Sequence, residues 1–226
     1  MTDPAHHRRI RSFVRREGRL TDGQREALQR QWPVYGLEKP DKPLNLNEIF
    51  GREAHRVIEI GFGDGENLRH QLRSRPELDF IGIEVYRIGV GRLLRAAAEV
   101  NASNLRVCCH DAVEVLAEWL PPHCVDEVWL YFPDPWHKKR HHKRRLVQPP
   151  FCDLVARVLK SGGEFRLATD WEPYAQHMQE VLSGHGQFAA SQNPITPEHR
   201  VTTRFQRRGE RLGHGVWDFA YRRLPV

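Results

Sequence analysis

Cysteine is scarce in this chain of 226 residues, and its four cysteines show no Cys-x-x-Cys spacing. Neither a zinc site nor a disulfide framework fits that pattern. We therefore expect no metal, and we expect free, buried or half-buried thiols in a reducing cytoplasm at Cys108, Cys109, Cys124 and Cys152.

Long hydrophobic runs are also missing. No apolar stretch approaches the roughly 18 residues that a membrane-spanning helix needs. Residues 1–9 lack the apolar core of a secretory signal. We therefore expect a cytoplasmic protein without a membrane partner. No obligate protein partner is evident from the sequence, and both a monomer and a homodimer stay open.

The positive charge of the chain is clustered. The formal net charge is +6, which points mildly toward a polyanionic partner. The basic clusters are an arm with Arg8, Arg9, Arg11, Arg15, Arg16 and Arg19, a run from Lys138 to Arg145, and a group with Arg200, Arg204, Arg207, Arg208 and Arg211. A charge run is usually a solvated loop, so its position relative to a site decides its interpretation.

Strand and helix patterns alternate after residue 50. We expect strands over 56–60, 80–84, 105–109, 125–131 and 163–168, and helices over 66–74, 87–100, 112–119, 151–159 and 172–183. This order predicts an α/β fold with a doubly wound, mostly parallel sheet. Residues 188–190 and 216–222 are predicted as two further strands, for which antiparallel pairing is an open alternative. We divide the chain into a basic arm and linker (1–50, with a short helix capped by Thr21 or Asp22 and a loop over 33–50) and a main domain (51–226).

A glycine-rich turn follows the first predicted strand. Gly61, Gly63 and Gly65 are spaced Gly-x-Gly-x-Gly, and position 66 is Glu, unlike the spacing of dinucleotide folds. Glycine allows positive φ and lets a ligand lie against bare backbone. The pattern favours a nucleoside ligand without a pyrophosphate, although a plain tight turn explains the glycines as well.

Three carboxylates lie in or after consecutive strands. Glu84 ends the second strand, where it can accept hydrogen bonds from ribose hydroxyls. Asp111 follows the third strand and can accept from an adenine amino group, or it can cap the next helix. Glu59 lies inside an apolar strand, and burying it unpaired is costly. We expect Glu59 to face the pocket and the cationic end of the ligand.

The fourth strand runs into Phe132-Pro133-Asp134-Pro135-Trp136. The two prolines fix φ around Asp134 and are expected to push the preceding residues toward extended backbone. A carboxylate held rigidly at a strand end suits a reaction site, and the plain alternative is a stiff turn with a solvated Asp.

These motifs together identify a resemblance. The chain resembles the bacterial tRNA (guanine-N7-)-methyltransferase family over nearly its whole length. The matching stretches are 11–16, 18–21, 58–63, 82–85, 132–136, 140–146, 168–171 and 202–205. The string from Phe132 to Trp136, followed by the basic run, is the specific part. The resemblance implies the class I methyltransferase fold and methyl transfer from S-adenosylmethionine to N7 of the variable-loop guanine (position 46) of tRNA.

The resemblance also implies roles for individual residues. Glu59, Gly61, Gly63, Gly65, Glu84, Asp111 and Asp134 would bind S-adenosylmethionine, and Asp134 would also be catalytic. Lys138, Asp170, Thr203, Arg204, Phe205 and Gln206 would contact tRNA. The family usually has Glu where this chain has Gln206. Asp170 has a competing role, because residues 169–172 fit a capping box for the next helix.

Other readings of the sequence share parts of this pattern. A methyltransferase for another RNA or for a protein would keep the pocket but not the segment 132–136. An RNA-binding module with a vestigial pocket would not need Glu59, Glu84 and Asp111. The glycine spacing argues against an NAD-dependent oxidoreductase.

Overall fold

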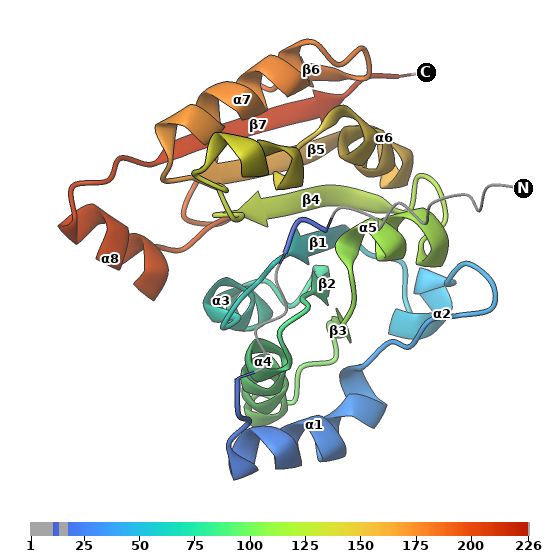
Figure 1. The fold of residues 1–226 in the computed structure, drawn as a ribbon. Helices are drawn as coiled ribbons and strands as arrows, with labels where there is room; N and C mark the ends of the chain where they lie inside the picture. The colour runs from blue at the N-terminus through green and yellow to red at the C-terminus, as the bar shows by residue number, and fades with distance from the viewer. Residues whose placement is uncertain (1–10, 14–17, 226) are drawn as a thin grey trace, which may run out of the picture.

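The computed structural model describes residues 11–13 and 18–225 (Figure 1). Arg8, Arg9, Arg15 and Arg16 of the predicted arm lie outside the described residues. The strands are β1 (Arg56–Ile60), β2 (Asp79–Ile83), β3 (Leu105–Cys108), β4 (Val125–Tyr131), β5 (Leu159–Thr169), β6 (Phe188–Ala190) and β7 (Trp217–Arg223). The α-helices are α1 (Asp22–Tyr35), α2 (Leu46–Phe50), α3 (Glu66–Ser74), α4 (Arg87–Glu99), α5 (Ala112–Glu114), α6 (Pro149–Val158), α7 (Glu172–Ser183) and α8 (Arg204–Arg211).

The seven strands form one sheet in the order β3-β2-β1-β4-β5-β7-β6. The first five strands of this order are parallel, and β7 is antiparallel to both of its neighbours. The predicted doubly wound sheet and its antiparallel tail are therefore confirmed. The strand order reverses between β1 and β4, where the carboxyl ends of parallel strands leave a crevice for a ligand.

Helices cover both faces of the sheet, and each face has its own hydrophobic core. Successive side chains of a strand point to opposite faces. Ile58 and Ile60 pack with residues of α6 and α7. Val57 packs with residues of α1, α3 and α4. Glu59 alternates with Ile58 and Ile60, so β1 directs its carboxylate to the α3 face at the ligand-binding end.

Residues 18–50 pack closely against the sheet domain. The Thr21 hydroxyl caps α1 as expected, and α1 continues past Pro33 to Tyr35. The loop expected over 33–50 is wrong in part, because Asn45 caps the short helix α2 through its side-chain oxygen. A five-residue helix is too short to show an apolar period in the sequence. The boundary at residue 50 stays a prediction.

Other elements differ from the expected pattern in detail. The helix expected over 112–119 is a single turn, α5, followed by a π-helical turn over Val115–Trp119. A 3₁₀ helix over Lys139–Arg144 and the helix α8 are not predicted from the sequence. The four cysteines are free, three of them buried and Cys109 half-buried, as expected. No described helix is long and apolar enough to cross a membrane.

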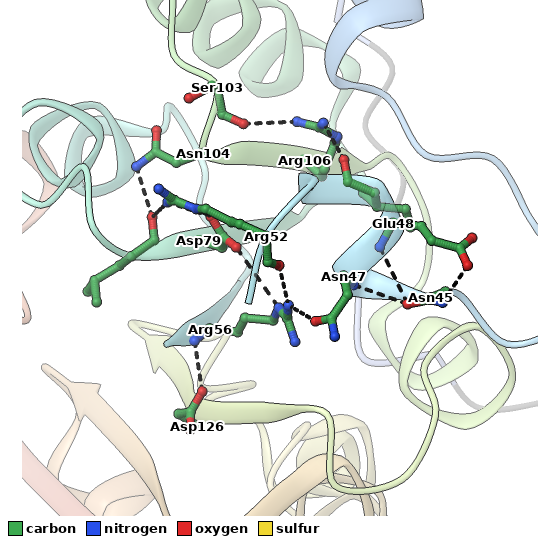
Figure 2. A network of polar contacts seen from close by, with 12 residues as sticks. Asn45, Asn47, Glu48, Arg52, Arg56, Asp79, Ser103, Asn104, Arg106 and Asp126 are labelled. Carbon is green, nitrogen blue, oxygen red and sulfur yellow. Dashed lines mark hydrogen bonds and ion pairs between the residues drawn. The ribbon is translucent and has the colours of Figure 1, made fainter. Parts of the chain in front are cut away.

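A polar network holds together the amino ends of the strands, away from the crevice (Figure 2). Asp79 begins β2, is fully buried, and accepts hydrogen bonds from Arg52 Nε at 2.9 Å and Nη2 at 2.7 Å. Arg56 begins β1, and its backbone N–H donates to Asp126 Oδ2 at 2.8 Å. The Arg56 side chain donates to Asn47 of α2. This network joins α2 to β2, β1 and β4.

Candidate functional site

The glycine turn after β1 is bent as the sequence predicts. Gly61, Gly63 and Gly65 have φ values of 70°, 56° and 72°, in the left-handed region that glycine adopts without strain. Helix α4 approaches the turn closely, because a Cβ added at Gly89 would lie 1.9 Å from the Gly63 carbonyl oxygen. The turn therefore presents bare backbone, and it leads directly into α3.

Glu84 organises this turn from the end of β2. Its carboxylate accepts hydrogen bonds from the backbone N–H groups of Gly63 at 2.8 Å, Val85 at 2.7 Å and Tyr86 at 3.0 Å. Burial raises the pKa of Glu84, these hydrogen bonds lower it, and the nearby charge of Asp134 raises it. Each carboxylate oxygen has two acceptor positions, so Glu84 can hold the turn and still accept from a ligand hydroxyl. That ribose contact stays a prediction.

Glu59 faces the crevice with a neutral partner. It is 4% exposed and accepts a hydrogen bond from Asn67 Nδ2 at 2.9 Å. Burial raises the pKa of Glu59 to about 8, against the lowering effect of the Asn67 hydrogen bond and together with the charge of Glu84. No cationic side chain of the described residues offsets that rise. A positively charged ligand group is what this carboxylate lacks.

Glu59 and the glycine turn line one cavity of about 350 Å³. Of the residues predicted for the site, Glu59, Gly61, Gly63, Thr203 and Phe205 line this cavity, whereas Gly65, Glu84 and Asp134 do not. The full lining is Glu59, Gly61, Phe62, Gly63, Asp64, Glu66, Asn67, Tyr131, Phe132, Arg200, Thr203 and Phe205. Asn67 is not predicted. It is 3% exposed on the buried face of α3, and its place directly before Leu68 in the sequence is only a weak signal of that burial.

Asp111 is not part of this lining. Its side chain caps α5 by accepting from the Val113 backbone N–H at 3.0 Å. The helix-cap alternative from the sequence is therefore confirmed. Contact with an adenine amino group remains a prediction for Asp111.

The segment from Phe132 to Trp136 is bent more sharply than its prolines suggest. Phe132 has a φ of 52° and Trp136 a φ of 49°, so the extended backbone expected before Pro133 is wrong. The Phe132 N–H still donates to Ala168 of β5 at 2.8 Å, because the chain turns out of the sheet only after this last bond. A left-handed φ at a bulky residue is strained. Asp134 is exposed on this turn, within electrostatic reach of Glu84.

The basic run after this segment is only partly a solvated surface. Lys138 is exposed, as a phosphate contact requires. Arg145 is 4% exposed and donates to the carbonyls of Pro135 at 3.0 Å and Pro173 at 3.2 Å. Arg144 donates to the carbonyls of Arg11 at 3.0 Å and Phe13 at 3.0 Å. The run is therefore neither a wholly solvated loop nor a uniform basic surface, and the burial of Arg145 excludes RNA contact for that residue.

The segment Thr203–Gln206 forms the first turn of α8 at the cavity. Thr203 caps the helix by accepting from the Gln206 N–H at 3.3 Å. The Arg204 N–H donates to Glu66 Oε2 at 2.7 Å. Phe205 is 56% exposed, and its ring centre lies 5.4 Å from that of Phe132. These contacts attach α8 to α3 and place an exposed aromatic ring beside the predicted reaction segment.

Gln206 points inward from α8. It is 8% exposed, accepts from Arg200, and donates its Nε2–H to Glu210 Oε1 at 2.7 Å. Arg200 is also turned inward: its side chain is 8% exposed and pairs with Asp218 at 2.9 Å. Arg200 is therefore no part of an exposed basic patch, which corrects the sequence interpretation. Gln206 has a structural role in α8, and its contact with tRNA stays a prediction.

Asp170 does not take part in a capping box. Helix α7 begins after Trp171 without any side-chain cap, and Thr169 Oγ1 accepts instead from the Trp171 N–H at 3.3 Å. Thr169 is the last residue of β5, and the N-cap position of α7 is Trp171, two residues further along the chain. The Asp170 carboxylate lies 3.4 Å from His214 Nδ1, just beyond α8. Its predicted contact with tRNA is untested.

The sequence and the fold are similar to those of known proteins. Residues 53–219 match the family described as "Putative methyltransferase". The tRNA (guanine-N(7)-)-methyltransferase of Shewanella woodyi is 53% identical over 221 residues, which cover 96% of this chain and 93% of that protein. The protein of the same name from Klebsiella pneumoniae is 54% identical over 221 residues, covering 96% of this chain and 92% of its own.

Solved structures with much lower identity share the fold. The 16S rRNA methyltransferase KamB superposes with a TM-score of 0.62 at 17% identity, covering 84% of this chain and 96% of its own. A SAM-dependent methyltransferase from Aquifex aeolicus has a TM-score of 0.52 at 16% identity, covering 79% of this chain and 87% of its own. These likenesses confirm the predicted class I methyltransferase sheet.

Proposed function

Since this chain belongs to the bacterial tRNA (guanine-N7-)-methyltransferase family, we propose that it methylates N7 of a guanine in tRNA and that this guanine is the one at position 46 of the variable loop. The observation that carries the proposal is 54% identity to a tRNA (guanine-N(7)-)-methyltransferase over 96% of the chain. The methyl donor is S-adenosylmethionine. Identity over nearly the full length covers the cavity at Glu59 as well as the basic elements around it.

The residues at the cavity fit the methyl donor. Glu59 is a carboxylate whose pKa is raised by burial and by the charge of Glu84, so a nearby cation would stabilise its ionised form, and the donor carries a sulfonium and an ammonium group. Glu84 and the glycine turn offer acceptors and open backbone to a nucleoside. Bound there, S-adenosylmethionine supplies an electrophilic methyl group. Glu59, Gly61, Gly63, Gly65, Glu84 and Asp111 hold it in our proposal.

Guanine N7 carries an in-plane lone pair and no proton, so the reaction needs no general base. The enzyme must align the ring with the methyl group, and such alignment can lower a barrier by roughly 7 kcal/mol or more. The methylated purine gains positive charge. A carboxylate held nearer to the purine than to the sulfur stabilises that change.

Asp134 meets these requirements better than the other carboxylates of the site. It is exposed on a turn fixed by two prolines and by the contacts of Trp136, whereas Glu59 and Glu84 are buried. In our proposal Asp134 orients the guanine through its N–H groups and offsets the new ring charge. The exposed Lys138, Arg204 and Phe205 and the half-buried Asp170 contact the surrounding tRNA, with Thr203 and Gln206 supporting them from α8.

A-form RNA hides N7 in a deep groove, so the target guanine must leave its tertiary contacts before it reacts. The enzyme acts in the cytoplasm in this proposal, in keeping with its four free cysteines.

Methyl-labelled donor and bulk tRNA test the proposal directly. We expect label in tRNA, 7-methylguanosine as the labelled nucleoside, and its position in the variable loop by fragment mapping. Equal labelling of a transcript in which that guanine is replaced by adenine would overturn the target assignment. Labelling of ribosomal RNA or protein in place of tRNA would overturn the substrate class.

A further inference from the structure

A second hollow, of about 850 Å³, is lined by residues of α3, α4 and the start of α8 and lies beside the cavity at Glu59 that we propose for the cofactor. Figure 1 shows where these three helices lie in the fold. It shares Asp64 and Glu66 with that cavity. Six arginines line it, two from each helix: Arg69, Arg73, Arg92, Arg95, Arg204 and Arg207. The four arginines of α3 and α4 belong to none of the basic clusters recognised in the sequence.

The spacing of these arginines explains why they converge. Arg69 and Arg73 are four residues apart on α3, so they share one face of the helix. Arg92 and Arg95 are three residues apart and share one face of α4. The hydrogen bond from the Arg204 N–H to Glu66 fixes the start of α8 against α3. Three helices that are far apart in the sequence therefore direct exposed guanidinium groups into one hollow.

The carboxylates of the hollow neutralise only half of this charge. Asp64 pairs with Arg92, Glu99 with Arg95 at 3.1 Å, and Glu66 with Arg207 at 2.9 Å. The side chains of Arg69, Arg73 and Arg204 form no hydrogen bond or ion pair with any of the described residues. Six arginines against three carboxylates leave three positive charges uncompensated. Glu66 also attracts Arg69, but the hollow keeps an excess of positive charge that an anionic ligand would offset.

A polyanion with regularly spaced charges fits this hollow best. Guanidinium groups bind phosphate oxygens in bidentate fashion, and an open groove of this size accommodates a sugar–phosphate strand. Because the hollow is continuous with the cofactor cavity at Asp64 and Glu66, a strand seated in it belongs to the same RNA whose base reaches the methyl donor.

We propose that this hollow binds the phosphodiester backbone of tRNA next to the target guanine. The inference rests on the proposed function. It extends the RNA-binding surface to α3 and α4. These helices lie on the side of the cofactor cavity away from the basic run Lys138–Arg145. The tRNA is then held on both sides of the reacting base.

The test removes charge from the two unpaired arginines of α3. Arg69→Gln with Arg73→Gln keeps helix-forming side chains and leaves every ion pair of the hollow intact. The matched control is Arg30→Gln with Arg222→Gln, which removes the same charge from exposed arginines on α1 and β7. The cofactor dissociation constant of each variant verifies that its fold is intact.

We expect kcat/KM for tRNA to fall roughly tenfold in the α3 variant, and the salt dependence of tRNA affinity to weaken by about 1.5 in log–log slope for two lost phosphate contacts. Arg69→Lys with Arg73→Lys should keep most of the slope, because the charge remains. Values equal to those of the control variant, in both readouts, would overturn the proposal. The same result is expected if the hollow binds an acidic protein instead of tRNA, because tRNA binding would then not depend on Arg69 and Arg73.

Failure of the proposed function gives a different result. If the wild-type enzyme forms no 7-methylguanosine, the function assignment fails. Direct tRNA binding by fluorescence anisotropy, with the same variants and the same salt series, then still decides the role of the hollow.

Discussion

The Arg144 guanidinium lies over the Trp136 ring, with its central carbon 3.9 Å from the ring centre. The Trp136 Nε1–H donates to the Ser12 carbonyl at 3.0 Å. Arg144 also donates to the carbonyls on either side of Ser12, those of Arg11 and Phe13. Residues 11–13 therefore pack against the segment Phe132–Trp136, and Arg144 contacts both.

Loss of this connection should weaken catalysis more than cofactor binding. We expect Arg144→Ala to lower kcat/KM for tRNA roughly tenfold, because a cation–π contact of about 1 kcal/mol and two charge-assisted hydrogen bonds are lost. The Arg144→Lys variant keeps the charge but loses the paired donors. Its kcat/KM for tRNA should lie between those of the wild type and Arg144→Ala. The cofactor dissociation constant should stay within twofold. Equal tRNA kinetics for both variants and the wild type would contradict the coupling.

Asp134 should affect turnover and binding separately. The Asp134→Asn variant keeps the shape of the side chain, replaces one acceptor oxygen with an NH₂ donor, and removes the charge. We expect kcat to fall roughly 100-fold, the size typical of one lost electrostatic contact to a transition state, with a cofactor affinity that changes only a few-fold. Single-turnover methylation and cofactor titration measure the two effects. Turnover near the wild-type rate in Asp134→Ala would exclude the catalytic role.

The sheet and the cofactor end of the site follow from the sequence for a physical reason. Strands such as β1 and β2 are buried on both faces, so they read as short apolar runs. A carboxylate such as Glu59 in one of these runs, or a glycine turn directly after it, is then conspicuous. A positive φ depends mainly on the residue type at that position, and glycine adopts it without strain. The bent turn at the three glycines can therefore be predicted from the sequence.

The tRNA side of the site depends on contacts between distant residues and is not predictable in the same way. Helix α8 has no apolar stripe, since Gln206 and Gly209 are its buried residues. Its anchor is Glu66, which is 138 residues away from Arg204. Whether an arginine is exposed also depends on tertiary partners: Arg200 and Arg145 look like their basic neighbours in the sequence and are buried in the fold.

Glu59 should make cofactor binding pH-dependent. Its pKa of about 8 leaves it mostly protonated at pH 7, and a cationic ligand favours the ionised form. We expect the affinity for S-adenosylmethionine to rise up to tenfold per pH unit between pH 6 and 8, with proton release on binding. Calorimetry in buffers of different ionisation enthalpy measures both. Glu59→Gln should bind weakly and without this slope, whereas Glu53→Gln, an exposed control, should match the wild type. A flat wild-type profile would contradict the assignment.

The same group should influence the stability of the free enzyme. Because the folded-state pKa of Glu59 is raised from 4.5 to about 8, the folded state binds more protons than the unfolded state in that window. The contribution of Glu59 to stability is present below pH 4.5 and is lost as the pH rises toward 8, by up to about 1.4 kcal/mol per pH unit. Denaturant unfolding without cofactor should therefore show a smaller loss between pH 6 and 8 in Glu59→Gln than in the wild type.

Gln206 should prove better suited to this chain than Glu. Its Nε2–H donates to Glu210, and a carboxylate at 206 would lose that donor and place two negative charges together. We expect Gln206→Glu to destabilise α8 by about 1 kcal/mol and to raise KM for tRNA. Adding Glu210→Gln should restore both, because it returns a donor to the pair. Thermal melts of the two single variants and the double variant measure the coupling, and strictly additive effects would contradict it.

Asp79 should matter for stability and not for the reaction. Its buried carboxylate holds Arg52 and lies 4.0 Å from Arg56, at the amino ends of the strands (Figure 2). Asp79→Ala leaves the buried Arg56 without that charge, and breaking a buried pair in this way costs about 3 kcal/mol. The free energy of unfolding should fall by that amount, and Asp79→Asn should lose less.

The distance of Asp79 from the cofactor cavity gives this prediction its control. Asp79 is the first residue of β2 and Glu84 follows its last residue. The two side chains therefore lie at opposite ends of this strand. At 20 °C the folded Asp79 variants should keep the wild-type cofactor affinity and kcat. Glu26→Ala on α1 breaks an exposed pair with Arg30 and should change the unfolding free energy very little. A loss of cofactor affinity in a folded Asp79 variant would mean that the amino-end network also shapes the glycine turn across the sheet.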